Sequence, residues 1–184
     1  MNQWIRMNLK DGRNMLHLLC GIPGSGKSTL AARMDGYVVS TDSIRKYLWN
    51  DESVIKHDEL VFKLAEDIVG YMLKKGHNVI FDATNLTAQK RKRFAAIAAK
   101  NDVKVTLHWV NCPLQTALER NALRDRKVPV EIIGNLYNSF QFPTFGEGIN
   151  VIKVYDSDLN IKQIVIPGFI LGEKAGYTKS PTKY

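Results

Sequence analysis

The chain carries the stretch Gly21-Ile22-Pro23-Gly24-Ser25-Gly26-Lys27-Ser28, which directly follows the apolar run Met15-Leu16-His17-Leu18-Leu19-Cys20. This G-x-x-x-x-G-K-S pattern, between an expected strand and an expected helix, is typical of a phosphate-binding loop. Its glycines let backbone N–H groups surround nucleotide phosphates, Lys27 can reach the β- and γ-phosphate oxygens, and the Ser28 hydroxyl suits Mg²⁺. A Gly-rich turn without a ligand would not need Lys27-Ser28-Thr29 in this order. We therefore expect a nucleotide to be bound by Gly21, Pro23, Gly24, Ser25, Gly26, Lys27, Ser28 and Thr29.

The composition of the 184-residue chain, 45% hydrophobic and 24% charged, is that of an ordinary globular protein, and the length fits one domain over residues 1–184. Apolar runs fall short of the roughly 18 residues of a transmembrane helix, and the N-terminus lacks a signal-peptide core, so we expect a cytoplasmic protein with no membrane partner. Two cysteines, Cys20 and Cys112, are too few for a disulfide framework. The net charge of +8 favours a polyanionic partner, but basic surfaces also serve solubility, so charge alone decides nothing.

Short apolar runs alternate with helical patterns along most of the chain. Strands are expected at 15–20, 37–40, 78–81, 104–110, 151–155 and 161–166, and helices at 28–34, 43–49, 58–74, 88–100, 114–125 and 130–139. This alternation predicts an α/β fold with a parallel sheet flanked by helices and with ligands at the carboxyl ends of the strands. Residues 114–145 are expected to form a helical lid, and residues 167–184, rich in Gly, Pro, Lys and Ser, a loosely attached tail.

An aspartate and an arginine follow the second expected strand. Asp42 and Arg45 are three residues apart and so share one face of the first turn of the next helix. A carboxylate here can accept the proton of an attacking hydroxyl, and an arginine beside it can hold a phosphate. Asp42 is also a good residue for a helix start, so a purely structural role stays open. Beside a phosphate-binding loop, the general-base role is favoured.

Polar residues also follow the third expected strand, in the order Asp82-Ala83-Thr84-Asn85. An aspartate after an apolar strand is typical of the second half of such a nucleotide site, where it holds Mg²⁺ with the help of water. Thr84 and Asn85 are expected to face the same cleft and to bind substrate. A local turn with backbone hydrogen bonds explains Asn85 equally well.

Four consecutive basic residues begin the next expected helix: Lys90, Arg91, Lys92 and Arg93. Cations at a helix N-terminus oppose the helix dipole, which invites a functional reason such as an anionic substrate strand crossing this end. A solvated charge run is the more frequent explanation of such a pattern.

Two arginines, Arg120 and Arg124, lie four residues apart on the expected helix 114–125. Like charges at this spacing repel each other unless an anion lies between them. Arginines above a phosphate loop can neutralise the transferring γ-phosphate, so both are expected to bind the nucleotide. A salt-bridged surface helix with Glu119 and Asp125 is the second interpretation.

Together these motifs resemble those of the 5′-hydroxyl polynucleotide kinases of phage-type and bacterial end-healing systems. The resemblance covers residues 14–142 and rests on segment 21–28, Asp42-Ser43-Ile44-Arg45, Asp82-Ala83-Thr84-Asn85 and Arg120-Asn121-x-x-Arg124-x-x-x-Val128-Pro129. It implies ATP, Mg²⁺ and a DNA or RNA 5′-OH end as ligands, Asp42 as general base, and an Arg45 contact to the acceptor's 3′-phosphate. It further implies that Lys27 and Arg124 take part in catalysis and that Ser28 and Asp82 hold the metal.

The resemblance also places residues 130–145 in an extended lid, with aromatic side chains on which a terminal base could stack, namely Tyr137, Phe140, Phe142 and Phe145. At least two of these aromatics are expected to belong to the core instead. Residues 156–160 superficially resemble an aspartyl-phosphatase motif, and we expect an ordinary turn there.

Other function classes share the same loop. Small-molecule kinases and zeta-toxin-like kinases of nucleotide sugars are one alternative, although the basic lid and residues 90–93 favour nucleic acid. A nucleotide switch is disfavoured, because the sequence has neither an Asn-Lys-x-Asp motif nor an Asp-x-x-Gly motif after the third strand. A homo-oligomer is compatible with the sequence.

Overall fold

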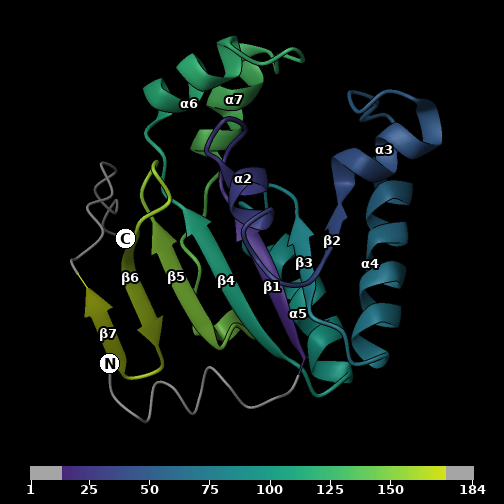
Figure 1. Ribbon diagram of the computed structural model, residues 1–184, viewed down its shortest axis with the longest axis vertical. Coiled ribbons are helices and arrows are strands. Elements are labelled where there is room, and N and C mark those ends of the chain that lie inside the picture. Colours follow the sequence, from purple (N-terminus) through teal and green to yellow (C-terminus); the bar gives the residue numbers. More distant parts are fainter. Residues whose placement is uncertain (1–13, 173–184) are drawn as a thin grey trace.

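The computed structural model describes residues 14–172, which form a sheet with helices packed against it (Figure 1). The strands are β1 (Met15–Cys20), β2 (Tyr37–Ser40), β3 (Val79–Asp82), β4 (Lys104–Val110), β5 (Val151–Tyr155), β6 (Ile161–Ile166) and β7 (Phe169–Gly172). The helices are α2 (Lys27–Ala31), α3 (Thr41–Trp49), α4 (Asp58–Lys74), α5 (Ala88–Lys100), α6 (Leu114–Ala122), α7 (Val130–Asn138) and the short 3₁₀ helix η1 (Phe145–Glu147). None of the helices within residues 14–172 is both long and apolar enough to cross a bilayer.

The sheet has the order β2-β3-β1-β4-β5-β6-β7, and its first five strands are parallel. The expected α/β fold with a helix-flanked parallel sheet is therefore confirmed. Strands β6 and β7 add an antiparallel edge, because the chain turns back after Tyr155 and again at Pro167-Gly168, where Gly168 has a φ of 79°. The expectation of a loose tail is wrong for Phe169–Gly172, which pairs with β6, and residues 173–184 lie outside the described part of the chain.

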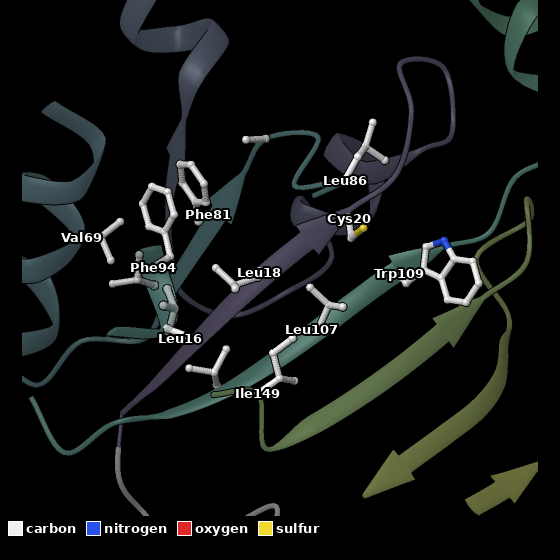
Figure 2. Close-up of a cluster of buried hydrophobic side chains, with 14 of the residues drawn as sticks. Leu16, Leu18, Cys20, Val69, Phe81, Leu86, Phe94, Leu107, Trp109 and Ile149 are labelled. Carbon is white, nitrogen blue, oxygen red and sulfur yellow. The ribbon is translucent and has the colours of Figure 1, made fainter. Parts of the chain in front are cut away.

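The larger core lies between one face of the sheet and helices α4 and α5. Alternate residues of β1, Leu16, Leu18 and Cys20, point toward it, because successive side chains of a strand face opposite sides (Figure 2). Phe81 of β3 stacks on Phe94 of α5 in the same layer. On the opposite face, α2 covers a smaller cluster around Leu19 and Ile80.

This opposite face also holds a chain of polar side chains. His17 Nδ1 lies 3.0 Å from His108 Nε2, and His108 Nδ1 lies 2.9 Å from the Tyr155 hydroxyl. Burial, reinforced by the nearby charge of Lys153, lowers the pKa of His17 to about 4. Burial also lowers the pKa of His108 and raises that of Tyr155 to about 12, so these three groups are neutral at pH 7.

Two helices that border the phosphate loop are shorter than their sequence pattern predicts. Helix α2 ends at Ala31 rather than at residue 34, and α6 ends at Ala122 rather than at residue 125. The side chain of Asn121 donates to the Val128 carbonyl at 2.8 Å and accepts from the Val128 N–H at 3.0 Å, which turns the chain back after α6. Arg124 is therefore carried by a loop and not by the helix on which it was expected.

Candidate active site

The phosphate loop connects β1 to α2 in the middle of the sheet (Figure 1). Gly24 and Gly26 have φ values of 81° and 105°, a region that favours glycine. A Cβ atom on Gly24 would collide with the backbone carbonyl of Ala117 in α6. The loop is tied to the segment after β3 by a hydrogen bond of 3.0 Å from the Gly21 N–H to the Thr84 carbonyl. These restraints fix the path of the loop backbone between β1 and α2.

Lys27 and Ser28 begin helix α2 at the end of this loop. The Lys27 ammonium donates to the Ile22 carbonyl at 2.9 Å, which folds its side chain over the loop. Burial lowers the pKa of Lys27, and the neighbouring carboxylate of Asp82 opposes this shift. The Ser28 hydroxyl donates to Asp82 Oδ2 at 2.8 Å, so the two residues expected to hold a metal lie side by side.

The oxygens of Ser28 and Asp82 fit Mg²⁺, which prefers hard ligands and usually keeps several waters beside nucleotide phosphates. Within residues 14–172, no group of three or more His, Cys, Asp or Glu side chains could hold a metal without a nucleotide.

Asp42 and Arg45 occupy the first turns of α3, on the side of the loop away from α6. The Ser40 hydroxyl accepts the Ser43 N–H at 3.3 Å and so caps this helix, which means that Asp42 is not needed for that role. Arg45 is buried and donates through Nη1 to Asp42 Oδ1 at 2.7 Å. It also donates through Nε and Nη2 to Asp58 Oδ1 at 2.9 and 2.7 Å. Arg45 thus holds Asp42 in place and is itself held by Asp58.

Three arginines approach the loop from the region of α6. Arg120 Nη1 donates to the Ser157 carbonyl at 2.7 Å, in the turn after β5. Arg126 pairs with Glu52 at 2.8 Å and lies 3.6 Å from Asp42 Oδ2. Within residues 14–172, the side chain of Arg124 makes no hydrogen bond or ion pair that would occupy it, and its charge lies near Lys27.

A single cleft of about 790 Å³ brings most of the predicted site residues together. Seven cationic and five acidic side chains line it, which leaves a surplus of two positive charges for an anionic ligand. The predicted residues along it are Pro23, Gly24, Gly26, Lys27, Ser28, Thr29, Asp42, Arg45, Asp82, Thr84, Arg120 and Arg124. Gly21, Ser25 and Asn85 are absent from this lining.

Asn85 does not lie where a substrate contact requires it. It is fully buried, with a φ of 46°, and its amide donates to the Leu19 carbonyl of β1 at 2.7 Å. The local structural interpretation of Asn85 therefore fits this placement, and the substrate-binding one does not. Ser25 is also fully buried, packed under the loop beside Gly21.

The four consecutive basic residues at the start of α5 do not form one surface. Lys90 lies over the ring of Phe62 and lines the cleft, whereas Arg93 pairs with Glu66 at 2.6 Å. Arg91 is fully buried and pairs with Glu147 through Nε at 2.6 Å and Nη2 at 3.0 Å. Consecutive helical residues are about 100° apart, so the run points in several directions. Neither of the two explanations left open for the run, a crossing substrate strand or a solvated charge run, holds for Arg91, because Arg91 belongs to the core.

The lid aromatics pack against the protein. Phe140 stacks on Trp109 at 4.9 Å between ring centroids, and Phe142 meets both rings edge-on. Tyr137, Phe140 and Phe145 pack against the larger core, which confirms that at least two of these aromatics are core residues. The cleft lining contains none of the four. The turn at residues 156–160 is confirmed as a turn between β5 and β6.

Sequence reasoning missed five charged residues of this cleft: Arg33, Glu52, Asp58, Arg126 and Asp158. Asp58 follows the acidic pattern of an ordinary helix start, and nothing in its spacing links it to Arg45, which lies 13 residues earlier. Arg126 follows Arg124 by two residues, and this proximity to a predicted lid arginine is the one signal that could have found it.

A family model described as "AAA domain" matches residues 16–143. The chain is 29% identical over 140 residues to the L-seryl-tRNA(Sec) kinase of Methanococcus maripaludis, covering 70% of this chain and 53% of that protein. It is also 29% identical over 149 residues to the bifunctional polynucleotide phosphatase/kinase of Schizosaccharomyces pombe, covering 78% and 34%. The chain thus spans about half of one curated relative and a third of the other.

Among solved structures, the Pnkp1/Rnl/Hen1 RNA repair complex contains a chain with the same fold, with a TM-score of 0.62 and 24% identity. That match covers 69% of this chain and 44% of the other. The resemblance to polynucleotide kinases is thereby confirmed. With its phosphate loop, its sheet order and a family match over residues 16–143, the chain belongs to the AAA domain family and has the fold of the P-loop kinases.

Proposed function

We propose that the protein is a kinase that transfers the γ-phosphate of ATP to the 5′-hydroxyl end of DNA or RNA. The observation that carries this proposal is that Asp42, held by Arg45, lines the same cleft as Lys27 and Ser28 of the phosphate loop. A carboxylate opposite a phosphate loop suits transfer to a hydroxyl, because it can accept the proton that the hydroxyl loses.

At the donor end, the loop and Lys27 would bind the ATP phosphates, and Arg120 and Arg124 would approach them from the lid. Arg124 is well suited to this role, because no partner within residues 14–172 occupies its guanidinium group. Ser28 and Asp82 would hold Mg²⁺, which supplies positive charge against the phosphate oxygens.

At the acceptor end, Asp42 would be the general base. Its Oδ1 is occupied by Arg45, so Oδ2 is the oxygen able to accept a proton from an acceptor hydroxyl. A guanidinium group has five N–H donors, and Arg45 uses three of them on Asp42 and Asp58. Two donors remain for a phosphate of the acceptor, as the resemblance implies, and Thr84 adds a hydroxyl to the same cleft.

A kinase of a small molecule or nucleotide sugar, of the zeta-toxin-like kind, is the second candidate. The basic residues 90–93 support this candidate, because they are distributed between the core, the cleft and the surface. They therefore do not form one wide positive surface on α5 for a nucleic-acid strand. The surplus of positive charge in the cleft and the polynucleotide phosphatase/kinase relative favour the nucleic acid.

The test is incubation with labelled ATP, Mg²⁺ and either a 5′-OH oligonucleotide or a panel of small hydroxyl acceptors. We expect label on the oligonucleotide, none with Lys27→Ala, and a loss of about 10²–10⁴-fold in kcat with Asp42→Asn while the KM for ATP is unchanged. Asp35→Asn is the matched control, because Asp35 is exposed and lies outside the cleft lining. Near-native turnover by Asp42→Asn would refute the base role, and label on a small acceptor alone would favour the second candidate.

A further inference from the structure

The two oxygens of the Asp42 carboxylate have different surroundings. Oδ1 accepts a hydrogen bond of 2.7 Å from the buried Arg45, which also donates to Asp58 through Nε and Nη2. Oδ2 lies 3.6 Å from Arg126 Nη1, which is longer than a hydrogen bond. Oδ1 is therefore anchored, while Oδ2 faces the cleft with Arg126 as its nearest cation among the described contacts.

Arg126 reaches this position across the mouth of the cleft. It belongs to the loop between α6 and α7, and its partner Glu52 belongs to the connection between α3 and α4, at the same end of the sheet (Figure 1). The side chains of Arg126 and Glu52 are 35% and 38% exposed, so water and salt weaken their pairing. An anion of higher charge can therefore replace Glu52 at Arg126.

A phosphate close to the reacting hydroxyl is such an anion. When an acceptor hydroxyl binds to Oδ2, the groups attached to it lie beside the Arg126 guanidinium group, whose planar fork matches phosphate oxygens. The charge of Arg45 is already balanced by two carboxylates, whereas Arg126 has one close partner at 2.8 Å and a second at 3.6 Å.

We propose that Arg126 is a specificity-determining residue, which exchanges Glu52 for the acceptor phosphate adjacent to the reacting hydroxyl. This inference rests on the proposed function, and it adds one residue to the binding of the acceptor phosphate that the resemblance already implies. It makes Arg126 a second phosphate contact beside Arg45, on the exposed side of the cleft.

The test compares a nucleoside with its 3′-monophosphate as acceptors, using the full chain with Arg126→Gln, Arg126→Lys and the control Lys127→Gln. Lys127 is exposed and outside the cleft lining, so its variant changes the same charge one residue away. We expect wild type to prefer the 3′-monophosphate in kcat/KM, and Arg126→Gln to raise the KM for that acceptor about 10- to 100-fold, as for a lost charge-assisted hydrogen bond. The KM for ATP should stay within twofold, and the kcat/KM for the nucleoside should fall by less than that for the 3′-monophosphate. Arg126→Lys should lie in between, and Lys127→Gln should match wild type.

Several results separate this inference from the proposed function. If wild type labels an oligonucleotide but shows no preference for the 3′-monophosphate, or if Arg126→Gln keeps that preference, the role of Arg126 is overturned while the proposed function stands. If Arg126→Gln weakens both acceptors equally, with an unchanged melting temperature, Arg126 does not read the phosphate. If wild type labels no nucleic-acid acceptor at all, the proposed function itself fails.

Discussion

Replacing Arg91 tests whether this member of the basic run stabilises the fold and does not bind substrate. Its side chain is fully buried, pairs with Glu147 at 2.6 and 3.0 Å, and donates to the carbonyls of Asn85 and Leu86 at 3.0 Å each. Arg91→Met would leave the buried Glu147 carboxylate without its cation and two carbonyls without a donor. Breaking a buried pair in this way costs about 3–5 kcal/mol of the free energy of unfolding. In a domain of this size, that corresponds to a fall in Tm of about 6–20 °C.

The assay is chemical and thermal unfolding of Arg91→Met beside the control Arg93→Met. Arg93 belongs to the same basic run, but its side chain is 48% exposed and that of Glu66 is 18% exposed, so its loss should cost less than that of Arg91, about 1 kcal/mol. Replacing both Arg91 and Glu147 by Met should recover much of the lost stability, because the uncompensated charge is removed as well. A variant Arg91→Met within 1 kcal/mol of wild type would refute this reasoning. So would a rise in the KM for an oligonucleotide without any loss of stability.

Two further predictions concern positioning and pH. Asp58→Asn should weaken the hydrogen bonds that hold Arg45. We expect kcat to fall about tenfold, which corresponds to the loss of one charge-assisted hydrogen bond, while the KM for ATP does not change. An unchanged kcat in steady-state kinetics would contradict this. The pKa of His17 is about 4 in the folded protein and about 6.5 in the unfolded chain. As the pH falls, the unfolded chain therefore binds the proton first, and the free energy of unfolding decreases between pH 6.5 and 4. His17→Asn keeps a neutral polar group near His108. Urea unfolding at pH 7 and pH 4.5 should show that this variant loses less stability than wild type, by up to about 3 kcal/mol. An identical loss in both proteins would exclude the effect.

The sequence predicts those parts of the fold and site that depend on neighbours along the chain. Strands β1 to β6, the phosphate loop and the pairing of Asp42 with Arg45 follow from local periodicity and from a three-residue spacing, whereas β7 was not expected. The pairing of Arg45 with Asp58 requires two helices to pack together, and no pattern within either helix contains that information.

Burial of a charge is equally hard to predict, because it depends on a partner far away in the chain. In the sequence, nothing distinguishes Arg91 from its basic neighbours. Its burial depends on Glu147, which lies 56 residues later in the chain. The end of α6 depends on Asn121, whose amide meets the backbone of Val128 seven residues later and places Arg124 on a loop. In both cases a specific side-chain hydrogen bond outweighs the helical pattern of the sequence.

The contact between Gly24 and the carbonyl of Ala117 has a consequence for how this chain can evolve. Both sides of the contact are backbone, so no change of rotamer can make room for a side chain at position 24. Any substitution there would displace α6, and with it Arg120, three residues further along the helix. The phosphate loop and α6 are thus sterically coupled through this contact. A loop transplanted from a relative would need the matching helix to come with it.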